Sequence, residues 1–196
     1  MPDRKPPTAR GAATWHRILE AAYAEFAEHG FAGARIERIT SAARTNKAQL
    51  YGYFGTKDAL FDAVLAESFR QIIDLATIDA YDLPGWAVRL YDEYLEHPDI
   101  VRLATWTRLE RRPRGYLVDE SDRQDAEKLA AIAAAQEAGV VRAGDPFDVM
   151  ALVISMSMAW SPVSTVYAAH PGEDAAEHDR RRELLRDAVR RAVAPS

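Results

Sequence analysis

The chain has 196 residues, of which 48% are hydrophobic and 28% are charged, and its formal net charge is −5. This length suits one large domain or two small ones, and the composition is that of an ordinary globular protein. The absence of cysteine excludes disulfides, thiolate metal sites and a cysteine nucleophile, so we expect a protein of the reducing cytoplasm. No apolar stretch reaches the ~20 residues that cross a bilayer, so no membrane partner is expected.

The charge is distributed unevenly along the chain. Residues 1–57 contain nine Lys/Arg and five Asp/Glu, which gives +4, so residues 58–196 carry −9. A basic module on an acidic body is typical of a protein that touches a polyanion with one end only. Chance variation among surface charges is the alternative explanation.

The N-terminal residues predict an arm followed by two helices. Residues 1–13 are polar and basic, and we expect them to form a flexible arm. Thr14 is a possible N-cap for a first amphipathic helix, which Gly30 ends. A second, shorter apolar stripe begins near Ile36 and ends near Arg44.

A two-turn helix follows, with capping residues at both ends. Asn46 is an N-cap residue, and Gln49 three positions later completes a variant of the capping box. The helix therefore runs over Lys47–Phe54 and stops at Gly55, and Thr56 can cap the next helix. Such a short helix adds little to a core, so we expect it to be displayed.

Two helices joined by a short turn, with the second one displayed, form a helix-turn-helix, and that second helix fits the DNA major groove. Leu50 and Phe54 are expected to face the supporting helices. A core plug made by residues 51–54 is the alternative. The side chains expected to face outward are Lys47, Gln49, Tyr51 and Tyr53.

These outward residues suit particular parts of DNA. Gln49 can make a bidentate contact with adenine, and Lys47 can contact guanine or phosphate. The tyrosine hydroxyls and Lys57 suit phosphate oxygens, and Gly52 lets the backbone approach the nucleic acid.

The stretch from Thr14 to Leu60 resembles the DNA-binding domain of the TetR (tetracycline repressor) family of bacterial transcriptional regulators. The matching segments read "ILEAAYAEFAEHGFAGARIERI" and "LYGYFGTKDAL". The resemblance implies that the Tyr-x-Tyr-Phe run and the lysine after it lie on the DNA backbone, and that three residues before them read bases. The implied backbone residues are Tyr51, Tyr53 and Lys57, and the implied base readers are Lys47, Ala48 and Gln49.

The turn departs from the family pattern. The family usually has Ala-Gly-Val-Ser where this chain has Ala43-Arg44-Thr45-Asn46. Arg44 in place of glycine costs roughly 1 kcal/mol if the backbone there needs positive φ, and it places a cation beside the DNA. Ala48 replaces a common glycine and offers a methyl group to thymine. The complete set of candidate DNA-binding residues is Arg35, Arg44, Asn46, Lys47, Ala48, Gln49, Tyr51, Tyr53 and Lys57.

The rest of the chain also predicts helices, so the fold class is all-α. The expected ranges are 86–96, 99–111, 121–138, 146–170 and 174–193, and Pro162 is expected to bend the fourth of them. The resemblance implies a three-helix DNA-binding domain at 14–57 and a helical ligand-binding and dimerisation domain at 58–196.

The resemblance and the residue pattern together indicate a dimer interface on the last two helices. In the last helix an apolar stripe lies opposite a row of arginines that includes Arg181, although burial of this stripe within one chain is the alternative. The candidate interface residues are Phe147, Met150, Leu184, Leu185, Ala188, Val189 and Ala192.

The expected ligand is a small hydrophobic or aromatic effector that releases the repressor from a palindromic operator. The candidate pocket residues are Trp86, Tyr94, Leu103, Trp106, Leu109, Ile154, Met158, Trp160 and Tyr167. Each is also compatible with plain core packing. Two charged stretches offer alternatives that the pattern disfavours: an anion site at the basic run 108–114, and a metal site at Asp119, Glu120, Asp122 and Asp125.

Two other classes of protein compete with the regulator. An all-helical enzyme is disfavoured because the five histidines show no H-E-x-x-H spacing and no nucleophile elbow or glycine-rich phosphate loop is present. A helical protein-interaction adaptor that has lost DNA binding is compatible with the altered turn at Arg44. We expect no enzyme activity, cofactor or metal.

Overall fold

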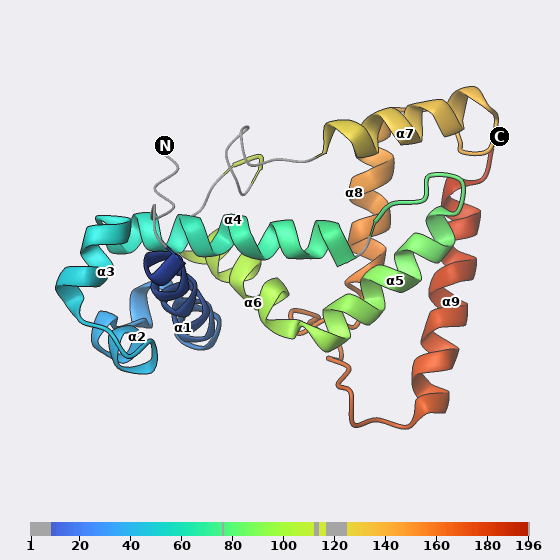
Figure 1. Ribbon diagram of the computed structural model, residues 1–196. Coiled ribbons are helices and arrows are strands. Elements are labelled where there is room, and N and C mark those ends of the chain that lie inside the picture. Colours follow the sequence, from blue (N-terminus) through green and yellow to red (C-terminus); the bar gives the residue numbers. More distant parts are fainter. Residues whose placement is uncertain (1–8, 76, 112–113, 117–124, 196) are drawn as a thin grey trace. The chain divides into compact units, whose positions relative to one another are not determined.

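The computed structural model describes residues 9–75, 77–111, 114–116 and 125–195. Every regular element in these ranges is a helix, which confirms the all-α prediction (Figure 1). The elements are α1 (Ala9–Gly33), α2 (Ile36–Ala42), α3 (Lys47–Phe54), α4 (Lys57–Leu75), α5 (Leu83–Glu96), α6 (Pro98–Trp106), the π-helical turn η1 (Thr107–Arg111), α7 (Ala126–Glu137), α8 (Pro146–Ser157) and α9 (Ala175–Val193). None of the described helices is long and apolar enough to cross a membrane.

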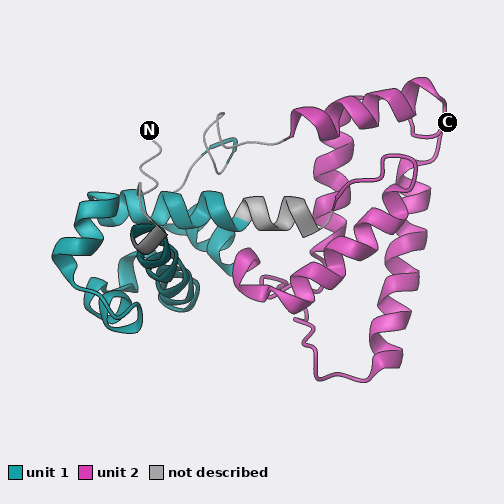
Figure 2. Ribbon diagram, viewed as in Figure 1, with its two compact units in different colours: residues 1–69, 102–120 teal, residues 70–101, 121–196 magenta. Residues whose placement is uncertain are grey.

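The chain forms two compact units, which Figure 2 shows in different colours. Unit 1 consists of residues 1–69 and 102–120, and unit 2 consists of residues 70–101 and 121–196. Unit 1 therefore contains, besides the expected DNA-binding segment, the first part of α4 and a later segment with the end of α6 and η1.

Helix α1 begins earlier than its sequence pattern predicts. It starts at Ala9, so residues 9–13 of the expected arm are helical, and residues 1–8 lie outside the described residues. The helical conformation breaks at Gly30, as predicted, with φ 68° and ψ 179°. A Cβ atom there would lie 2.9 Å from the ring of Trp106, so glycine is required both by its φ and by the close approach of this side chain.

The core of unit 1 supports α3. Leu50 of α3 and Ile39 of α2 are fully buried with Ile18 and Phe26 of α1. Phe54 stacks on Trp15, with ring centroids 5.8 Å apart. Truncating one such fully buried aliphatic residue to alanine costs about 2–5 kcal/mol, so the short helix is held firmly although only two of its side chains, Leu50 and Phe54, are buried.

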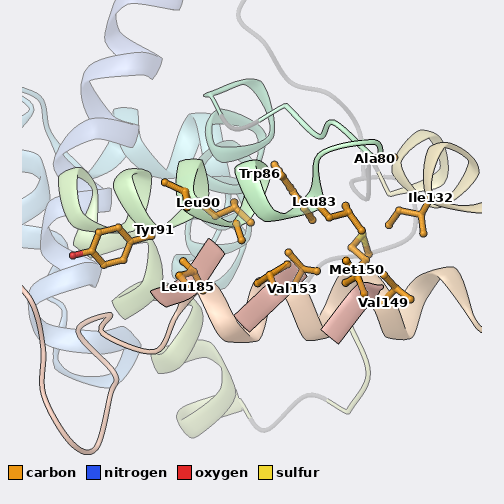
Figure 3. Packing of buried hydrophobic residues seen from close by; sticks show 14 of the residues in the cluster. Ala80, Leu83, Trp86, Leu90, Tyr91, Ile132, Val149, Met150, Val153 and Leu185 are labelled. Carbon is orange, nitrogen blue, oxygen red and sulfur yellow. The ribbon is translucent and has the colours of Figure 1, made fainter. Parts of the chain in front are cut away.

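The core of unit 2 lies between α5, α7, α8 and α9. Figure 3 shows Leu83, Trp86 and Leu90 of α5 beside Val153 of α8 and Leu185 of α9. Helix α5 begins at Leu83 because the Asp82 side chain accepts a hydrogen bond from the Gly85 backbone N–H at 2.9 Å.

The prediction of one helix over residues 146–170 was wrong, because α8 ends at Ser157. Pro162 has no backbone N–H to donate and disfavours helical backbone at the residue before it. The chain turns instead, and the Ser161 N–H donates to the Met158 carbonyl at 3.0 Å. Residues 158–174 therefore form a connecting segment, which the Ala169 N–H ties back to the Trp160 carbonyl at 2.9 Å.

One other predicted helix range differs from the structure. The helix expected at 99–111 becomes π-helical from Thr107, whose hydroxyl donates to the Leu103 carbonyl at 2.9 Å. Of the acidic residues that the sequence offers for a metal site, Asp119, Glu120 and Asp122 lie outside the described residues.

Candidate nucleic-acid interface

Helix α3 has the caps that its sequence predicts. The Asn46 side chain accepts a hydrogen bond from the Gln49 backbone N–H at 2.9 Å, and Gly55 ends the helix with φ 77°. The Thr56 hydroxyl accepts from the Ala59 N–H at 3.0 Å and begins α4. The second half of the capping box differs from the prediction, because the Gln49 side chain accepts a hydrogen bond from the Thr45 hydroxyl at 2.5 Å.

The two sides of α3 differ sharply in exposure. Leu50 and Phe54 face the core, with 0% and 9% of their surface exposed. The opposite side is exposed at Lys47, Ala48, Gln49, Tyr51 and Gly52, and Tyr53 is half-buried. A Cβ atom at Gly52 would meet nothing within 4 Å, so the backbone here is open to close approach.

Arg44 occupies the turn between α2 and α3 in a left-handed conformation. Its φ is 51°, and it is the one non-glycine residue with positive φ in the described part of the chain. The turn is closed by the Thr45 N–H, which donates to the Thr40 carbonyl at 2.9 Å. The turn therefore keeps the conformation for which glycine is best suited, while the arginine head remains exposed beside α3.

Lys47 is held by an acidic partner on α2. Its Nζ lies 2.5 Å from Oε1 of Glu37, and both side chains are more than half exposed. The hydrogen bond from Lys47 lowers the pKa of Glu37, and the same contact raises the pKa of Lys47. Both groups are therefore charged at neutral pH, and two of the three ammonium donors of Lys47 are not used by this contact with Glu37.

A buried carboxylate fixes the start of α2. Glu25 of α1 accepts from the Arg35 backbone N–H at 2.8 Å and from Arg38 Nε at 2.7 Å. Burial alone raises the pKa of Glu25, but the hydrogen bonds from Arg38 and the Arg35 backbone outweigh it and hold this pKa below its usual value. These bonds fix the backbone of Arg35 at the start of the helix, while its own side chain remains exposed.

Lys57 is tied to the junction of α1 and α2. Its Nζ donates to the Ala34 carbonyl at 2.7 Å and lies 4.8 Å from the centre of the Phe31 ring. An ammonium group has three donors, so a phosphate oxygen can share this lysine with Ala34.

Arg17 is a cation near the turn that sequence reasoning missed. Its Nε donates to the Ala43 carbonyl at 3.3 Å, and its Nη2 donates to the Thr14 hydroxyl at 3.1 Å. Thr14 is thus a buried residue within α1 rather than its N-cap. No local pattern marks Arg17, because its contact with Ala43 spans 26 residues.

Comparisons with known proteins agree with this geometry. The family model described as "Bacterial regulatory proteins, tetR family" matches residues 18–64, and "Tetracyclin repressor-like, C-terminal domain" matches residues 82–191. The HTH-type transcriptional repressor SCO4008 of Streptomyces coelicolor is 38% identical over 184 residues, which are 92% of this chain and 95% of that protein. The chain belongs to the TetR family. It is accordingly a DNA-binding transcriptional regulator.

Solved structures of transcriptional regulators share the fold. A putative transcriptional regulator from Streptomyces coelicolor, SCO4942, has 36% identity and a TM-score of 0.74, covering 92% of this chain and 98% of its own. A putative regulator from Saccharomonospora viridis, crystallised in complex with choline, has 21% identity and a TM-score of 0.60, covering 91% and 96%. The second likeness shows the fold alone.

The candidate pocket residues of this TetR regulator fall in both units. Leu103, Trp106 and Leu109 belong to unit 1, where Leu103 is fully buried and Leu109 is 62% exposed. The six candidates that belong to unit 2 are Trp86, Tyr94, Ile154, Met158, Trp160 and Tyr167. Of these six, Trp160 and Tyr167 line a groove of about 790 Å³.

The dimer candidates divide between the inside and the outside of unit 2. Met150, Leu185 and Val189 are buried in its own core, with 7%, 3% and 0% of their surface exposed. Leu184 and Phe147 are 60% and 38% exposed, and Ala188 and Ala192 are half-buried. The intramolecular alternative thus accounts for one face of α9, while Leu184 lies on another face.

Proposed function

We propose that this TetR regulator binds a palindromic operator as a dimer, represses transcription there, and is released by a small hydrophobic or aromatic effector. The observation that carries the proposal is α3, a firmly capped two-turn helix whose exposed side presents Lys47, Gln49 and Tyr51. The relative SCO4008 from Streptomyces coelicolor is a transcriptional repressor, which supports repression as the mode of regulation. A protein that binds a bacterial chromosome acts in the cytoplasm.

The exposed residues take different roles on DNA. Gln49 suits a bidentate contact with adenine, and Lys47 suits guanine in the major groove. Tyr51, Tyr53 and Lys57 suit phosphate oxygens on the flanking backbone. The exposed cations Arg35 and Arg44 and the cap residue Asn46 complete the contact set, and the exposed methyl group of Ala48 suits thymine.

A dimer would present two copies of α3 to the two half-sites of a palindrome. The exposed residues Phe147 and Leu184, with the half-buried Ala188 and Ala192, offer a face of α8 and α9 to a second copy. An isologous pairing of this face relates the two α3 helices by a two-fold axis, and they can then enter successive major grooves about 34 Å apart.

The effector acts by preferring one conformation. A compound that binds unit 2 more tightly when the two α3 helices are wrongly spaced draws the dimer away from DNA. The factor by which the effector lowers operator affinity cannot exceed the ratio of its affinities for the two conformations. DNA must weaken effector binding by the same factor.

The roles of the α3 residues are tested by exchanging single side chains. We expect Gln49→Ala to relax preference at one base position per half-site and Tyr51→Ala to weaken binding to all sequences alike. Tyr81→Ala is the matched control, because Tyr81 is an exposed tyrosine of unit 2. Titration against a panel of single-base operator variants measures both effects. Unchanged binding of both α3 variants would reject this assignment.

A further inference from the structure

The side chain of Gln49 on α3 is held by a hydroxyl group of the turn that precedes the helix. The Thr45 hydroxyl donates a hydrogen bond to Oε1 of Gln49 at 2.5 Å. The two residues are four positions apart, so the contact spans about one helical turn. Thr45 is half-buried and Gln49 is exposed. An exposed glutamine that suits base reading is therefore already bound to a neighbour.

Hydrogen bonds also hold the backbone at both ends of this contact. The Thr45 N–H donates to the Thr40 carbonyl at 2.9 Å, which closes the turn. The Gln49 N–H donates to the side chain of Asn46, the N-cap of α3, at 2.9 Å. Because both backbones are held, the contact between the side chains determines where the Gln49 amide lies.

The contact also determines which way round the amide lies. The last torsion of a glutamine side chain has two roughly equivalent orientations, which exchange the oxygen and the nitrogen. In the structure the oxygen is the atom that lies at the Thr45 hydroxyl. Nε2 of Gln49 has no hydrogen-bond partner among the described residues, so its two N–H donors are available to a ligand.

The amide held in this orientation matches adenine. In the major groove adenine presents the N7 acceptor beside the N6 amino donor, whereas guanine presents two acceptors, N7 and O6. A carbonyl oxygen has a second lone pair, so Oε1 can accept from N6 while Nε2 donates to N7. With guanine the same orientation sets Oε1 against O6, where two acceptors face each other. An amide that is free to turn avoids this conflict by donating from Nε2 to O6.

We propose that Thr45 is a positioning residue for base reading, whose hydroxyl fixes the Gln49 amide in the orientation that reads adenine and thereby strengthens discrimination against guanine. A contact formed before DNA binds also lowers the entropy cost of ordering a long exposed side chain at the base. This inference rests on the proposed function, because it requires Gln49 to contact a base of the operator.

A purely structural role for the hydroxyl makes a different prediction. If the bond to Gln49 only stabilised the start of α3, its loss would weaken binding by the same factor whichever base Gln49 meets. A positioning role affects the two bases differently, because adenine loses a partner held in place and guanine gains a donor for O6. Thr45→Val separates the two roles, since valine keeps the β-branched shape and removes the hydroxyl. Thr45→Ser keeps the donor.

The experiment uses the full-length protein and the duplex that it enriches from a random pool. The base pair that Gln49 reads is identified as the position at which Gln49→Ala loses its preference. Duplexes with adenine or guanine at that position are titrated by fluorescence anisotropy. We expect Thr45→Val to lower the ratio of adenine to guanine affinity about fivefold, and Thr45→Ser to keep most of it.

The matched control is Ser41→Ala, which removes another hydroxyl of the same unit at an exposed position of α2. Its ratio of adenine to guanine affinity should equal that of the wild type. Melting temperatures show whether each variant is folded.

Several results would overturn the inference. These are an unchanged ratio in Thr45→Val, an equal loss of affinity for the adenine and guanine duplexes, a Thr45→Ser variant that behaves like Thr45→Val, or a wild type that prefers guanine at this position. If Gln49→Ala relaxes one position while Thr45→Val keeps the ratio, the positioning role alone fails. If the folded wild type enriches no sequence, the proposed function is rejected and the inference fails with it.

Discussion

Nζ of Lys47 lies 2.5 Å from Oε1 of Glu37, so an acid of α2 holds the first residue of α3. The pair joins residues ten positions apart across the turn. Under the proposed role of Lys47 in DNA binding, Glu37 competes with DNA for this lysine and also places a negative charge near the phosphates. These two effects act in the same direction, against binding.

Removing this competitor should strengthen DNA binding. We expect Glu37→Gln to raise operator affinity roughly twofold to fivefold at low salt, and the gain should shrink as salt screens the charges. Glu20→Gln on α1 is the control, because Glu20 is an exposed acid of the same unit. Fluorescence anisotropy at two ionic strengths measures the effect, and weaker binding of Glu37→Gln would show that Glu37 orients Lys47 instead.

Two substitutions of Arg44 distinguish the backbone strain of the turn from the effect of the arginine charge on DNA binding. Both Arg44→Gly and Arg44→Ala remove a cation beside α3, so both should weaken binding to all sequences and lower the salt slope by about 1. Only glycine relieves the φ of 51°, so Arg44→Gly should unfold with a free energy about 1 kcal/mol higher than Arg44→Ala. Urea denaturation compares the two, and equal stability would mean that the turn stores no strain.

If α8 and α9 form the proposed dimer interface, a charge placed on it should give a monomer. Leu184→Glu places a charge on the exposed face of α9 and should give a monomer with operator affinity reduced at least about tenfold. Leu109→Glu is a close control, because Leu184 and Leu109 are 60% and 62% exposed. Analytical ultracentrifugation reports the mass, and a dimeric Leu184→Glu protein would place the interface elsewhere.

Acid should release the segment that Glu173 anchors. The hydrogen bond from Arg181 lowers the pKa of Glu173 from its ordinary value of 4.5 to about 2. Since the folded-state pKa is the lower one, ionised Glu173 stabilises the fold above about pH 4.5, and this contribution is lost as the pH falls towards 2. The stability gap between wild type and Glu173→Gln should therefore narrow on acidification, as followed by urea denaturation.

The control for this pH effect is Glu183→Gln, an exposed acid on the same helix. Its stability should follow that of the wild type at every pH. A gap between wild type and Glu173→Gln that stays constant down to about pH 2.5 would contradict the assigned role of the Glu173–Arg181 pair.

The DNA-reading part of the fold could be predicted because its determinants are local. The caps at Asn46 and Thr56 and the glycine at Gly55 act within a few residues of the chain, and the structure confirms all three. The inward direction of Leu50 and Phe54 follows from the same short-range spacing.

Unit 2 was harder to predict because its determinants are not local. Arg181 belongs by spacing to the charged face of α9, yet it is 7% exposed because Glu173 and Tyr167 cover it. The contact between Tyr91 and His178 joins residues 87 positions apart, and no sequence pattern indicates such a pair. The sequence pattern predicts a helix that bends at Pro162, whereas in the structure α8 ends at Ser157.

The most direct test of the central claim is selection of bound sequences from a random DNA duplex pool, followed by titration of the enriched duplex at two salt concentrations. The account predicts an inverted repeat with half-sites about one helical turn apart, and affinity that falls steeply with salt. A folded, dimeric sample that enriches no sequence would contradict it, and a helical protein-interaction adaptor would then describe the chain better.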